Sequence, residues 1–412
     1  MITICDREKC PGCRLCEIVC PVNAITFAAD SRGFHYPFVS EALCVKCGLC
    51  QRSCPQNTPE IPKITYEQKA FAAWSCNRNI RKTSSSGGIF SELAAQVLKN
   101  GGAVCGAAFS SDFSVRHIFI ESSDELSKLR GSKYVQSDIS SVYPALSSRL
   151  KKQNVLFVGT PCQVAAIKKF VNMHNLNSAN LYTCDLVCHG APSPLIWQEY
   201  LNDLKRKYKS IPQEISFRNK DDGWVRYNMK IIFANGKTYK KNSPCDCFSR
   251  GFLRELISRE CCGTCDYASP YRQGDLTLCD FWGYKAVGEF DRDTDEGISL
   301  VIINNSHGDN LWQQIENKIV KFPRDVQQAM QGNRCFHKAF PNSPLRETFW
   351  RDYLRRGYEF VRRKYLYPDK KTKIKRSFFI KAIMRKILVF FLGKESYSSL
   401  VTKIKKRMGI CR

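Results

Sequence analysis

Residues 10–21 read CPGCRLCEIVCP, and residues 44–55 repeat the same cysteine spacing as CVKCGLCQRSCP. Each run has the form C-x2-C-x2-C-x3-C and is followed at once by proline. The two-residue spacers let three thiolates wrap around one face of an inorganic cage, while the fourth thiolate is free to reach elsewhere. Gly12 and Gly48 allow the backbone to turn tightly around such a cage. These two runs therefore determine the fold expected for the N-terminal region.

The repeated run is typical of a bacterial-type two-cluster ferredoxin, in which the fourth cysteine of each run binds the other cluster. The expected ligands are Cys10, Cys13, Cys16 and Cys54 for one 4Fe-4S cluster, and Cys44, Cys47, Cys50 and Cys20 for the other. Zinc is the alternative, because it also uses C-x2-C pairs, but it needs no triplet with a trailing Cys-Pro. Cys5 lies outside the pattern, and we expect a structural role for it.

Composition points to metal or redox chemistry in a reducing compartment. The chain has 412 residues with 22 cysteines, and 43% of its residues are hydrophobic, which excludes wholesale disorder. The N-terminus has no basic region followed by an apolar stretch, so we expect no secretory signal. No apolar run approaches the roughly 18 residues of a spanning helix. We therefore expect a cytoplasmic protein, soluble or peripheral to a membrane, whose thiols do not form disulfides.

Charge and linker composition divide the chain into three expected domains. Residues 1–62, the ferredoxin domain, carry no net charge and end in a Pro-rich stretch suited to an extended linker. Residues 63–345 form a mildly basic body. Residues 346–412 form a basic helical tail, and the last 62 residues hold 20 of the 64 basic side chains but only 4 of the 38 acidic ones.

The tail combines an apolar helical segment, within residues 373–392, with flanking clusters of lysine and arginine. This combination is typical of attachment in the plane of an anionic membrane surface, or of contact with a partner protein. The alternative is a helix packed on the body with a solvated basic end. Charge alone would also permit binding to nucleic acid, but no nucleic-acid motif accompanies it, and we do not expect that partner.

The body alternates between strand and helix patterns. Strands are expected at 104–109, 115–121, 155–158 and 180–187, and helices from Thr160-Pro161 to 170 and from Ser193-Pro194 to about 208. Residues 227–233 and 237–241 flank Asn235-Gly236, which predicts a hairpin with a two-residue turn. The mixture predicts an α+β or mixed α/β fold with a mixed sheet. No G-x-G-x-x-G motif follows a strand, which disfavours a nicotinamide-binding Rossmann unit.

Several phrases in the body, in order over roughly residues 68–285, resemble the coenzyme F420 hydrogenase/dehydrogenase beta-subunit family. They are SSSGG at 84–88, RGSKY at 130–134, VGTPCQ at 158–163, CHGAPS at 188–193, FRNK at 217–220, CGTC at 262–265 and DFWG at 280–283. A ferredoxin module like residues 1–62 also occurs in that family. The resemblance implies an iron–sulfur flavoprotein oxidoreductase with FAD and a further 4Fe-4S cluster in this flavoprotein-like domain.

The same resemblance implies a reaction class without naming a substrate. Electrons would pass from reduced ferredoxin or a deazaflavin, through 4Fe-4S clusters and FAD, to an organic small molecule. The alternative is an electron-transfer subunit whose catalytic site lies on a partner protein. A third hypothesis, an iron–sulfur protein that binds nucleic acid, predicts affinity that falls steeply with salt.

The cysteines of the body also favour a third cluster on their own. Cys262 and Cys265 form a tight pair, and Cys188 follows a predicted strand. Cys162 stands at a predicted helix start, where amide dipoles stabilise a thiolate. Together they supply the four ligands that a cubane takes. The rival ligands are Cys184, Cys261 and Cys279, and buried, unreactive thiols are the alternative for any of these residues.

The serine- and glycine-rich phrases suit the pyrophosphate of FAD. Glycines allow close backbone approach, hydroxyls and amides donate to phosphate oxygens, and Lys133 would balance the charge. The expected cofactor-binding residues are Ser85, Ser86, Gly87, Gly88, Gly131, Ser132, Lys133 and Tyr134. The alternative is an ordinary loop in which the serines at 84–86 cap an apolar helix beginning at Ile89.

His189 is the candidate catalytic residue, because an imidazole ordinarily titrates near neutrality and can donate a proton to substrate. Its alternative role is to support the adjacent cysteine ligand. Arg218 and Lys220 are candidates for binding an anionic substrate, and simple solvation of both is the alternative.

Overall fold

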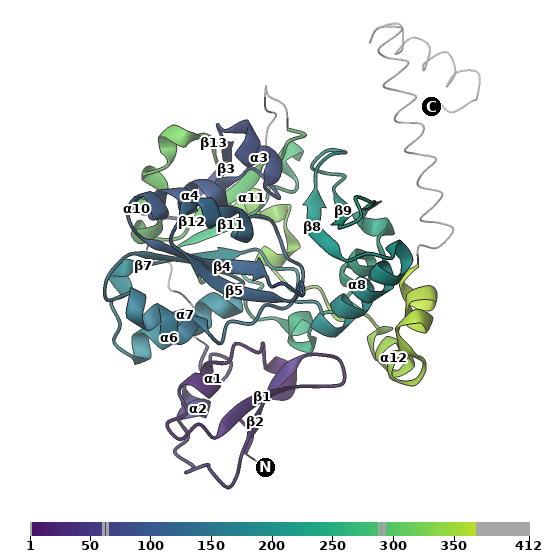
Figure 1. Cartoon of the computed structure of the whole chain (residues 1–412). Helices are drawn as coiled ribbons and strands as arrows, with labels where there is room; N and C mark the ends of the chain where they lie inside the picture. The colour runs from purple at the N-terminus through teal and green to yellow at the C-terminus, as the bar shows by residue number, and fades with distance from the viewer. Residues whose placement is uncertain (1, 60–61, 63–65, 287–289, 291–293, 368–412) are drawn as a thin grey trace, which may run out of the picture.

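The computed structural model describes residues 2–59, 62, 66–286, 290 and 294–367 (Figure 1). It confirms the expected fold class, because a small ferredoxin-like domain at the N-terminal end adjoins a larger body built on a mixed sheet. Near the C-terminal end of its described part, the body carries a further helix, α12 (Arg346–Val361). The apolar helix expected within residues 373–392 lies outside the described residues. Within the described parts of the chain, no helix is long and apolar enough to cross a membrane.

The ferredoxin domain folds around its two cysteine runs. Its elements are η1 (Arg7–Lys9), α1 (Leu15–Ile18), the antiparallel pair β1 (Ile25–Ala29) and β2 (His35–Val39), and α2 (Leu49–Arg52). Each run has positive φ at the second and fourth residues after its first cysteine: Gly12 and Arg14 in one, Lys46 and Gly48 in the other. Each run therefore has two equivalent left-handed positions. Glycine occupies the first of them in one run and the second in the other, and a basic residue adopts the strained conformation at the remaining position.

The body contains an eight-stranded sheet in the order β13-β3-β12-β11-β7-β6-β4-β5. Its strands are β3 (Lys69–Ser75), β4 (Ala103–Phe109), β5 (Val115–Ile120), β6 (Val155–Gly159), β7 (Leu181–Leu186), β11 (Leu276–Asp280), β12 (Ser299–Ile303) and β13 (Ile319–Arg324). The four central strands, β11, β7, β6 and β4, run parallel, and antiparallel strands complete both edges. The strands predicted from the sequence pattern are confirmed to within one or two residues.

Helices cover both faces of this sheet. Helices α4 (Ile89–Lys99) and α10 (Ser306–Gln313) lie on one face, and α6 (Val142–Arg149) and α7 (Pro161–Met173) on the other (Figure 1). All five residues of β6 are buried, as expected for an apolar parallel strand between two helical layers. The remaining short helices and turns are α3 (Arg78–Thr83), η2 (Ser123–Glu125), α5 (Leu126–Leu129), η3 (Ser178–Asn180), η6 (Tyr284–Ala286), η7 (Glu316–Lys318), α11 (Val326–Gln331) and η8 (Arg334–Phe336).

A second, smaller sheet packs beside the first. It is antiparallel, with the order β10-β9-β8, and comprises β8 (Pro212–Asn219), β9 (Asn228–Phe233) and β10 (Thr238–Asn242). It shares a core rich in aromatic rings with α8 (Pro194–Tyr208), α9 (Cys247–Leu253), α12 and η9 (Arg362–Leu366). The short turns η4 (Ser243–Cys245) and η5 (Glu260–Thr264) flank α9 in the chain. Phe349 and Trp350 of α12 are fully buried in this core, so the described start of the predicted tail packs on the body.

The hairpin between β9 and β10 forms where expected, but its turn differs from the prediction. The Phe233 amide donates to the carbonyl oxygen of Lys237 (2.9 Å), so the loop has three residues rather than two. Gly236 is left-handed, with φ of 77°, and Asn235 is not. Asn235 instead donates from its side chain to the carbonyl of Tyr208 at the end of α8 (3.0 Å). This tertiary contact accompanies the longer loop.

Candidate functional site

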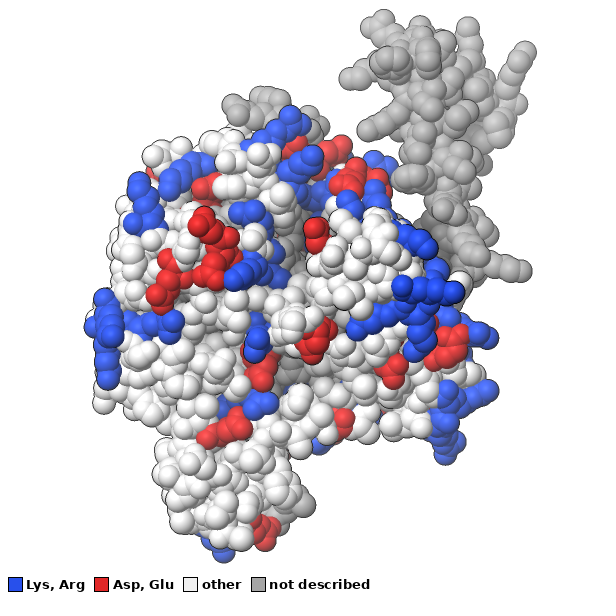
Figure 2. Space-filling view, viewed as in Figure 1, with Lys and Arg blue, Asp and Glu red and all other residues white. Residues whose placement is uncertain are grey.

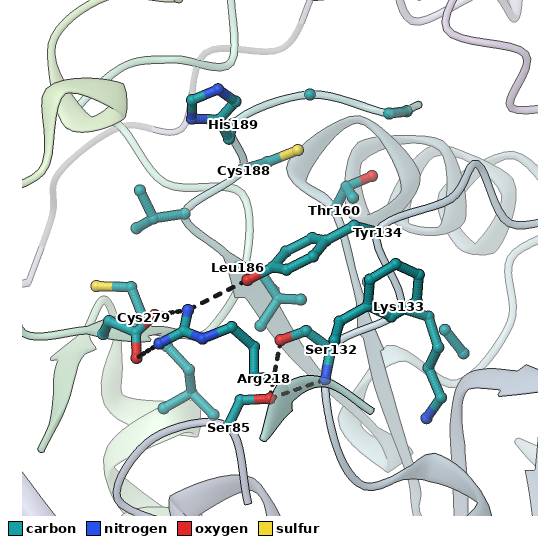
Figure 3. A pocket seen from close by; sticks show the side chains of 18 of the residues that line it. Ser85, Ser132, Lys133, Tyr134, Thr160, Leu186, Cys188, His189, Arg218 and Cys279 are labelled. Carbon is teal, nitrogen blue, oxygen red and sulfur yellow. Dashed lines mark hydrogen bonds and ion pairs between the residues drawn. The ribbon is translucent and has the colours of Figure 1, made fainter. Parts of the chain in front are cut away.

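The carboxyl ends of β6, β7 and β11 open onto a cavity of about 610 Å³ (Figure 3). In a parallel sheet, the loops that follow neighbouring strands meet at one edge, where ligands usually bind. Cys162 follows β6 and Cys188 follows β7, so topology alone brings these two cysteines to the same edge. The walls are largely apolar and include Phe217, Phe252 and Trp282. Such a cavity suits a planar, largely apolar group with polar contacts at its ends.

The serine phrase forms one end of the cavity. Ser85 accepts hydrogen bonds from the amide and the hydroxyl of Ser132 (2.9 and 3.0 Å), as Figure 3 shows. The hydroxyl of Ser86 donates to the carbonyl of Ile298 (2.7 Å). Helix α4 begins after Gly88 with no side-chain cap. The simple capping role considered for these serines is therefore wrong, because they join separate loops.

The uncapped start of α4 faces the cavity. Its first residues, Ile89 and Phe90, line the wall together with Ser85, Ser86 and Ser132. The first amides of a helix have no partner within the helix and favour an anion. This end of the cavity therefore combines amide donors, hydroxyls and space, which are the features that phosphate oxygens require.

The three glycines of these phrases have different roles. A Cβ at Gly87 would lie 2.4 Å from the carbonyl oxygen of Ala73, and one at Gly88 would lie 3.1 Å from the Ile80 side chain. Both glycines therefore permit close packing within the protein itself. Gly131 is left-handed, with φ of 84°, and has open space around its Cβ position. Gly88 and Gly131 line the cavity, whereas Gly87 is not among its lining residues.

The cationic groups at this end are Lys133 and Arg130. Lys133 donates to the backbone carbonyls of Lys128 (2.9 Å) and Arg130 (3.1 Å), so its amine holds the end of α5. Burial lowers the pKa of Lys133 to about 7. Arg130 donates to the hydroxyls of Ser91 (3.0 Å) and Thr83 (3.2 Å). Neither hydroxyl carries charge, and the guanidinium lies beside the serines, although Glu92 is within electrostatic reach of it.

A buried ion pair borders the middle of the cavity. Arg218 donates to both carboxylate oxygens of Asp280 (2.6 and 3.0 Å) and to the Tyr134 hydroxyl (3.2 Å). The Trp224 indole also donates to Asp280 (2.7 Å). Since the charge of Arg218 is already neutralised, this residue is poorly suited to hold an anionic substrate. Lys220 is committed as well, because its amine donates to three backbone carbonyls, including that of Ser86 (2.9 Å).

The structure brings the four candidate ligands of the third cluster together. Burial raises the pKa of Cys188, and the nearby thiols of Cys262, Cys162 and Cys265 raise it further. Burial likewise raises the pKa of Cys162 to about 11 and of Cys265 to about 12, and each lies within electrostatic reach of Cys262. All four sulfurs are therefore mutual neighbours. Cys162 and Cys188 also line the cavity.

The rival cysteines separate into two groups. Cys184 is fully buried in the sheet core, and its thiol points to the carbonyl of Asp185. Cys279 lines the cavity, but its thiol contacts the Leu300 carbonyl. Burial raises the pKa of these two thiols, and the charges that raise it further come from aspartates rather than other cysteines. Cys261, in contrast, hydrogen-bonds to Cys262 and lies beside the four.

The N-terminal cysteines group as the crossed pattern predicts. Burial raises the pKa of Cys16, and the neighbouring Cys13, Cys10 and Cys54 add to the increase. Cys50 has Cys20, Cys44 and Cys47 as its thiol neighbours. These last four cysteines line a cavity of about 120 Å³. We call the two groups the proximal set (Cys10, Cys13, Cys16, Cys54) and the distal set (Cys20, Cys44, Cys47, Cys50).

Two further observations concern Cys5 and the geometry of possible metal ligands. Cys5 hydrogen-bonds to Cys10 and Cys54, which raises the pKa of Cys5 and places it against the proximal set. Among the residues that the structure describes, no three His, Cys, Asp or Glu side chains converge tightly enough to hold one metal ion.

The cysteine sets are arranged in series. Cys16 of the proximal set lies within electrostatic reach of Cys50 of the distal set, and Cys13 within reach of Cys162. Tyr267 is half-buried and lies near both the proximal set and Cys162: burial raises its pKa, and the charges of Cys162, Cys13, Cys265 and Cys54 raise it further. The order is therefore distal set, proximal set, body cysteines, cavity.

His189 lies at the cavity, beside Cys188 (Figure 3). Its Nε2 makes a very short hydrogen bond with a carboxylate oxygen of Glu255, which is nearly buried and has φ of 54°. The imidazole stacks on Phe340, with ring centroids 4.1 Å apart. The ring is thus held firmly in one orientation at the cavity wall.

Three site residues were not predicted from the sequence: Arg130, Glu255 and Arg259. Arg130 precedes Gly131 within the RGSKY phrase, so the sequence shows its position, but the sequence does not show which groups its guanidinium contacts. Glu255 and Arg259 contact residues that lie 66 and 249 positions away. No spacing rule detects such pairs. The sequence also does not predict the left-handed conformation of Glu255, because glutamate is not a residue type that favours positive φ.

Comparison with known protein families gives three matches. Residues 9–58 match the 4Fe-4S dicluster domain. Residues 70–143 match the N-terminal domain, and residues 152–324 the C-terminal domain, of the coenzyme F420 hydrogenase/dehydrogenase beta subunit. The two body matches together span most of the main sheet and all of the residues that we place at the cavity from β6 to β11.

Curated relatives agree with these matches. A subunit of the F(420)H(2) dehydrogenase of Methanosarcina mazei is 23% identical over 294 residues, which cover 68% of this chain and 79% of that protein. Coenzyme F420-dependent sulfite reductase of Methanocaldococcus jannaschii is 25% identical over 326 residues, 76% of this chain but only 47% of that protein. An uncharacterized ferredoxin of the same organism is 36% identical over 66 residues, 16% of this chain and 84% of its own length.

Proposed function

Because the chain belongs to the coenzyme F420 hydrogenase/dehydrogenase beta-subunit family and carries a 4Fe-4S dicluster domain, we propose that it is an iron–sulfur flavoprotein oxidoreductase. Single electrons from reduced ferredoxin or a reduced deazaflavin would pass along the distal set, the proximal set and the body cysteines to FAD. FAD in the cavity would exchange an electron pair with an organic small molecule. Iron–sulfur clusters and an oxidoreductase role are properties of the family, whereas FAD, its partners and the number of clusters are part of the proposal.

One observation carries this proposal. A single cavity has the serine- and glycine-rich phrases at one end and Cys162 and Cys188 at the other. A group of suitable length bound there would lie against both the phosphate-type donors and the body cysteines. Short separation is what electron transfer from a cluster to an organic cofactor needs, and the protein supplies that geometry rather than the chemistry.

The residues present fit FAD. The uncapped start of α4, the hydroxyls of Ser85 and Ser132 and the charge of Arg130 would hold the pyrophosphate. The apolar walls, including Phe252 and Trp282, would hold the flavin ring. The bound flavin would supply conversion between one-electron and two-electron transfer. Lys133 would act mainly by fixing the loop, since its amine already bonds to two carbonyls.

The distal set is the proposed point of electron input. Cys47 is exposed, and Leu43 and Val45 beside it are 56% and 61% exposed. An exposed apolar rim around a cluster ligand suits transient contact with a redox partner. His189 is the proposed proton donor at the opposite end of the path, where Glu255 and Phe340 orient its ring toward the cavity. His189→Asn should then lower turnover while the iron and flavin contents stay unchanged.

Anaerobic reconstitution tests the proposal directly. The purified chain should bind roughly twelve irons, as three cubanes require, and one FAD. Electron paramagnetic resonance of the reduced protein should show interacting 4Fe-4S signals, and the flavin should be reduced when a low-potential donor is added. Zinc in place of iron, or a full set of clusters with no affinity for flavin, would refute it.

A relay subunit is the second candidate, because a relative that this chain resembles is itself described as one subunit of a dehydrogenase. The last turn of α8 carries Lys205, Arg206 and Lys207, and Figure 2 shows lysine and arginine gathered on that side of the body. A basic surface of this kind suits an acidic partner protein. Purified chain that turns over no small molecule until a partner is added would select the relay function.

A further inference from the structure

Arg259 is a buried cation whose described contacts include no carboxylate. Its exposed fraction is 0%, and its described side-chain hydrogen bonds reach only carbonyl or amide oxygens and one sulfur. Three other buried arginines each have a carboxylate partner: Arg272 with Asp185, Arg218 with Asp280, and Arg346 with Glu347. A buried charge without a counter-charge is strongly unfavourable. Arg259 therefore needs a negative partner of another kind.

The guanidinium is directed at the first cysteine of the proximal set. Its Nε donates to the carbonyl of Cys10 (2.7 Å), and one terminal nitrogen reaches the Cys10 sulfur at 3.8 Å. The same nitrogen donates to the His35 carbonyl (3.0 Å), and the other donates to the Gln136 side chain (3.0 Å). Most of these acceptors belong to the ferredoxin domain, although Arg259 belongs to the body.

The backbone of Arg259 is tied to the body cysteines. Its amide donates to the carbonyl of Ala191 (2.8 Å), in the loop that begins with Cys188, and its carbonyl accepts from the Cys262 amide (3.1 Å). The Ala191 amide in turn reaches the Cys262 sulfur (3.4 Å). The charge of Arg259 therefore lies between the proximal set and the body cysteines.

Aromatic rings exclude water from this position. The guanidinium lies 4.1 Å from the Tyr36 ring centroid and 5.6 Å from that of Phe34, which is buried. A charge in such a low-dielectric site acts far more strongly on its neighbours than a solvated one. Arg7 stacks on the same Tyr36 ring, at 3.7 Å, but its side chain is 55% exposed and pairs with Asp30. The chain thus contains a solvated counterpart of Arg259.

We propose that Arg259 is the counter-charge of the cluster held by the proximal set, and that it raises the reduction potential of that cluster while fixing the ferredoxin domain against the body. A cluster bound by four thiolates is negatively charged, and taking one electron from the upstream donor makes it more so, with no bond formed or broken. A fixed positive charge favours the reduced form. The inference rests on the proposed function only in requiring a 4Fe-4S cluster at the proximal set.

The test is a potentiometric titration of the reconstituted full-length chain, followed by electron paramagnetic resonance. In Arg259→Gln, the ratio of reduced to oxidised proximal cluster at a given potential should fall about tenfold, which corresponds to a midpoint about 59 mV lower. The distal cluster of the same molecule is the internal reference and should not shift. Arg7→Gln, the matched control, should leave both midpoints unchanged, because water already screens that charge.

Arg259→Lys distinguishes charge from shape. It should keep the ratio within about threefold of the unmodified chain, because the positive charge remains. If Arg259→Gln loses iron from the proximal set, retention of that iron in Arg259→Lys supports the proposal, and its loss in both variants overturns it. Intact clusters with an unchanged midpoint in Arg259→Gln also overturn it. Absence of 4Fe-4S signals from the unmodified chain would instead refute the proposed function.

Discussion

The two halves of the molecule assemble their cysteines in different ways. In the ferredoxin domain, every member of the proximal and distal sets lies within the 45 residues from Cys10 to Cys54. In the body, the four cysteines come from the segments that follow two adjacent parallel strands, and from η5 and the residue after it, across 104 residues of chain from Cys162 to Cys265. The first arrangement depends on local spacing, and the second depends on the sheet being built correctly.

This difference has a consequence for folding and loading. Short spacers preorganise the ferredoxin cysteines, and the metal can then stabilise the small domain that holds it. The body cysteines need a preformed edge of β6 and β7, and that edge is stabilised by apolar helices on both sides of the sheet. Changes to a body cysteine should therefore remove a cluster and leave the fold, whereas changes in the ferredoxin domain should affect both.

The largest expected effect comes from removing one of the four candidate ligands in the body, Cys162, Cys188, Cys262 and Cys265. Cys188→Ala should lose about four irons, one cubane, and retain secondary structure by circular dichroism. Cys184→Ala is the matched control, because it lies four residues earlier, in β7, with its sulfur in the core. It should retain all iron with some loss of stability. Equal iron loss in both variants would remove the distinction between ligand and core cysteine.

The next effect concerns the end of the cavity opposite the cysteines. Arg130→Gln removes a charge whose described hydrogen bonds reach two hydroxyls, with Glu92 within electrostatic reach. Loss of a charge-assisted phosphate contact is worth about 1.5–3 kcal/mol, so FAD affinity should fall roughly 10- to 100-fold, measured by fluorescence titration. Lys128→Gln is the control, since Lys128 is exposed and pairs with Glu125. Affinity unchanged in Arg130→Gln would place the pyrophosphate elsewhere.

The contrast between the halves also explains what could be predicted from sequence. The eight N-terminal cysteines are grouped by spacing alone, and the strands and helices of the body follow from their apolar patterns. The partners of the charged side chains do not follow from such patterns. Lys133 bonds to the carbonyls of its own loop, Arg218 pairs with Asp280, and Arg259 contacts Cys10 from the far side of the chain. The pairings of Arg218 and Arg259 join residues that are far apart in the chain, so they depend on the completed topology, which local patterns cannot encode. The pairing of Lys133 is local, because its acceptors lie three and five residues away.

A third prediction concerns a buried histidine in the body. His117 of β5 accepts from Ser137 at Nδ1 (2.7 Å) and donates from Nε2 to the Val158 carbonyl (3.0 Å). Burial lowers its pKa from 6.5 to about 4. Between these pH values His117 is therefore protonated in the unfolded chain and neutral in the folded chain. Its stabilising contribution is therefore present above pH 6.5 and is lost as the pH falls toward 4.

The corresponding measurement is denaturant unfolding at pH 7 and pH 5, followed by the fluorescence of the buried tryptophans. The native chain should lose about 2 kcal/mol from this histidine alone over that interval. His117→Gln should be less stable at pH 7 but should show a pH dependence smaller by about that amount. An identical pH dependence in the two proteins would mean that folding does not lower the pKa of His117.

The smallest effect tests the one hairpin whose turn differed from expectation. A two-residue turn of the Asn-Gly type needs positive φ at both positions, whereas the observed loop needs it only at Gly236. Gly236→Ala should therefore cost about 1 kcal/mol, with no clash because the space around its Cβ position is open. Asn235→Gly should also destabilise the protein, since it loses the hydrogen bond to Tyr208 and gains no conformational relief. In a two-residue turn, Asn235→Gly would instead be neutral or stabilising, so the sign of this change in unfolding free energy decides whether local sequence or the contact with α8 sets the loop.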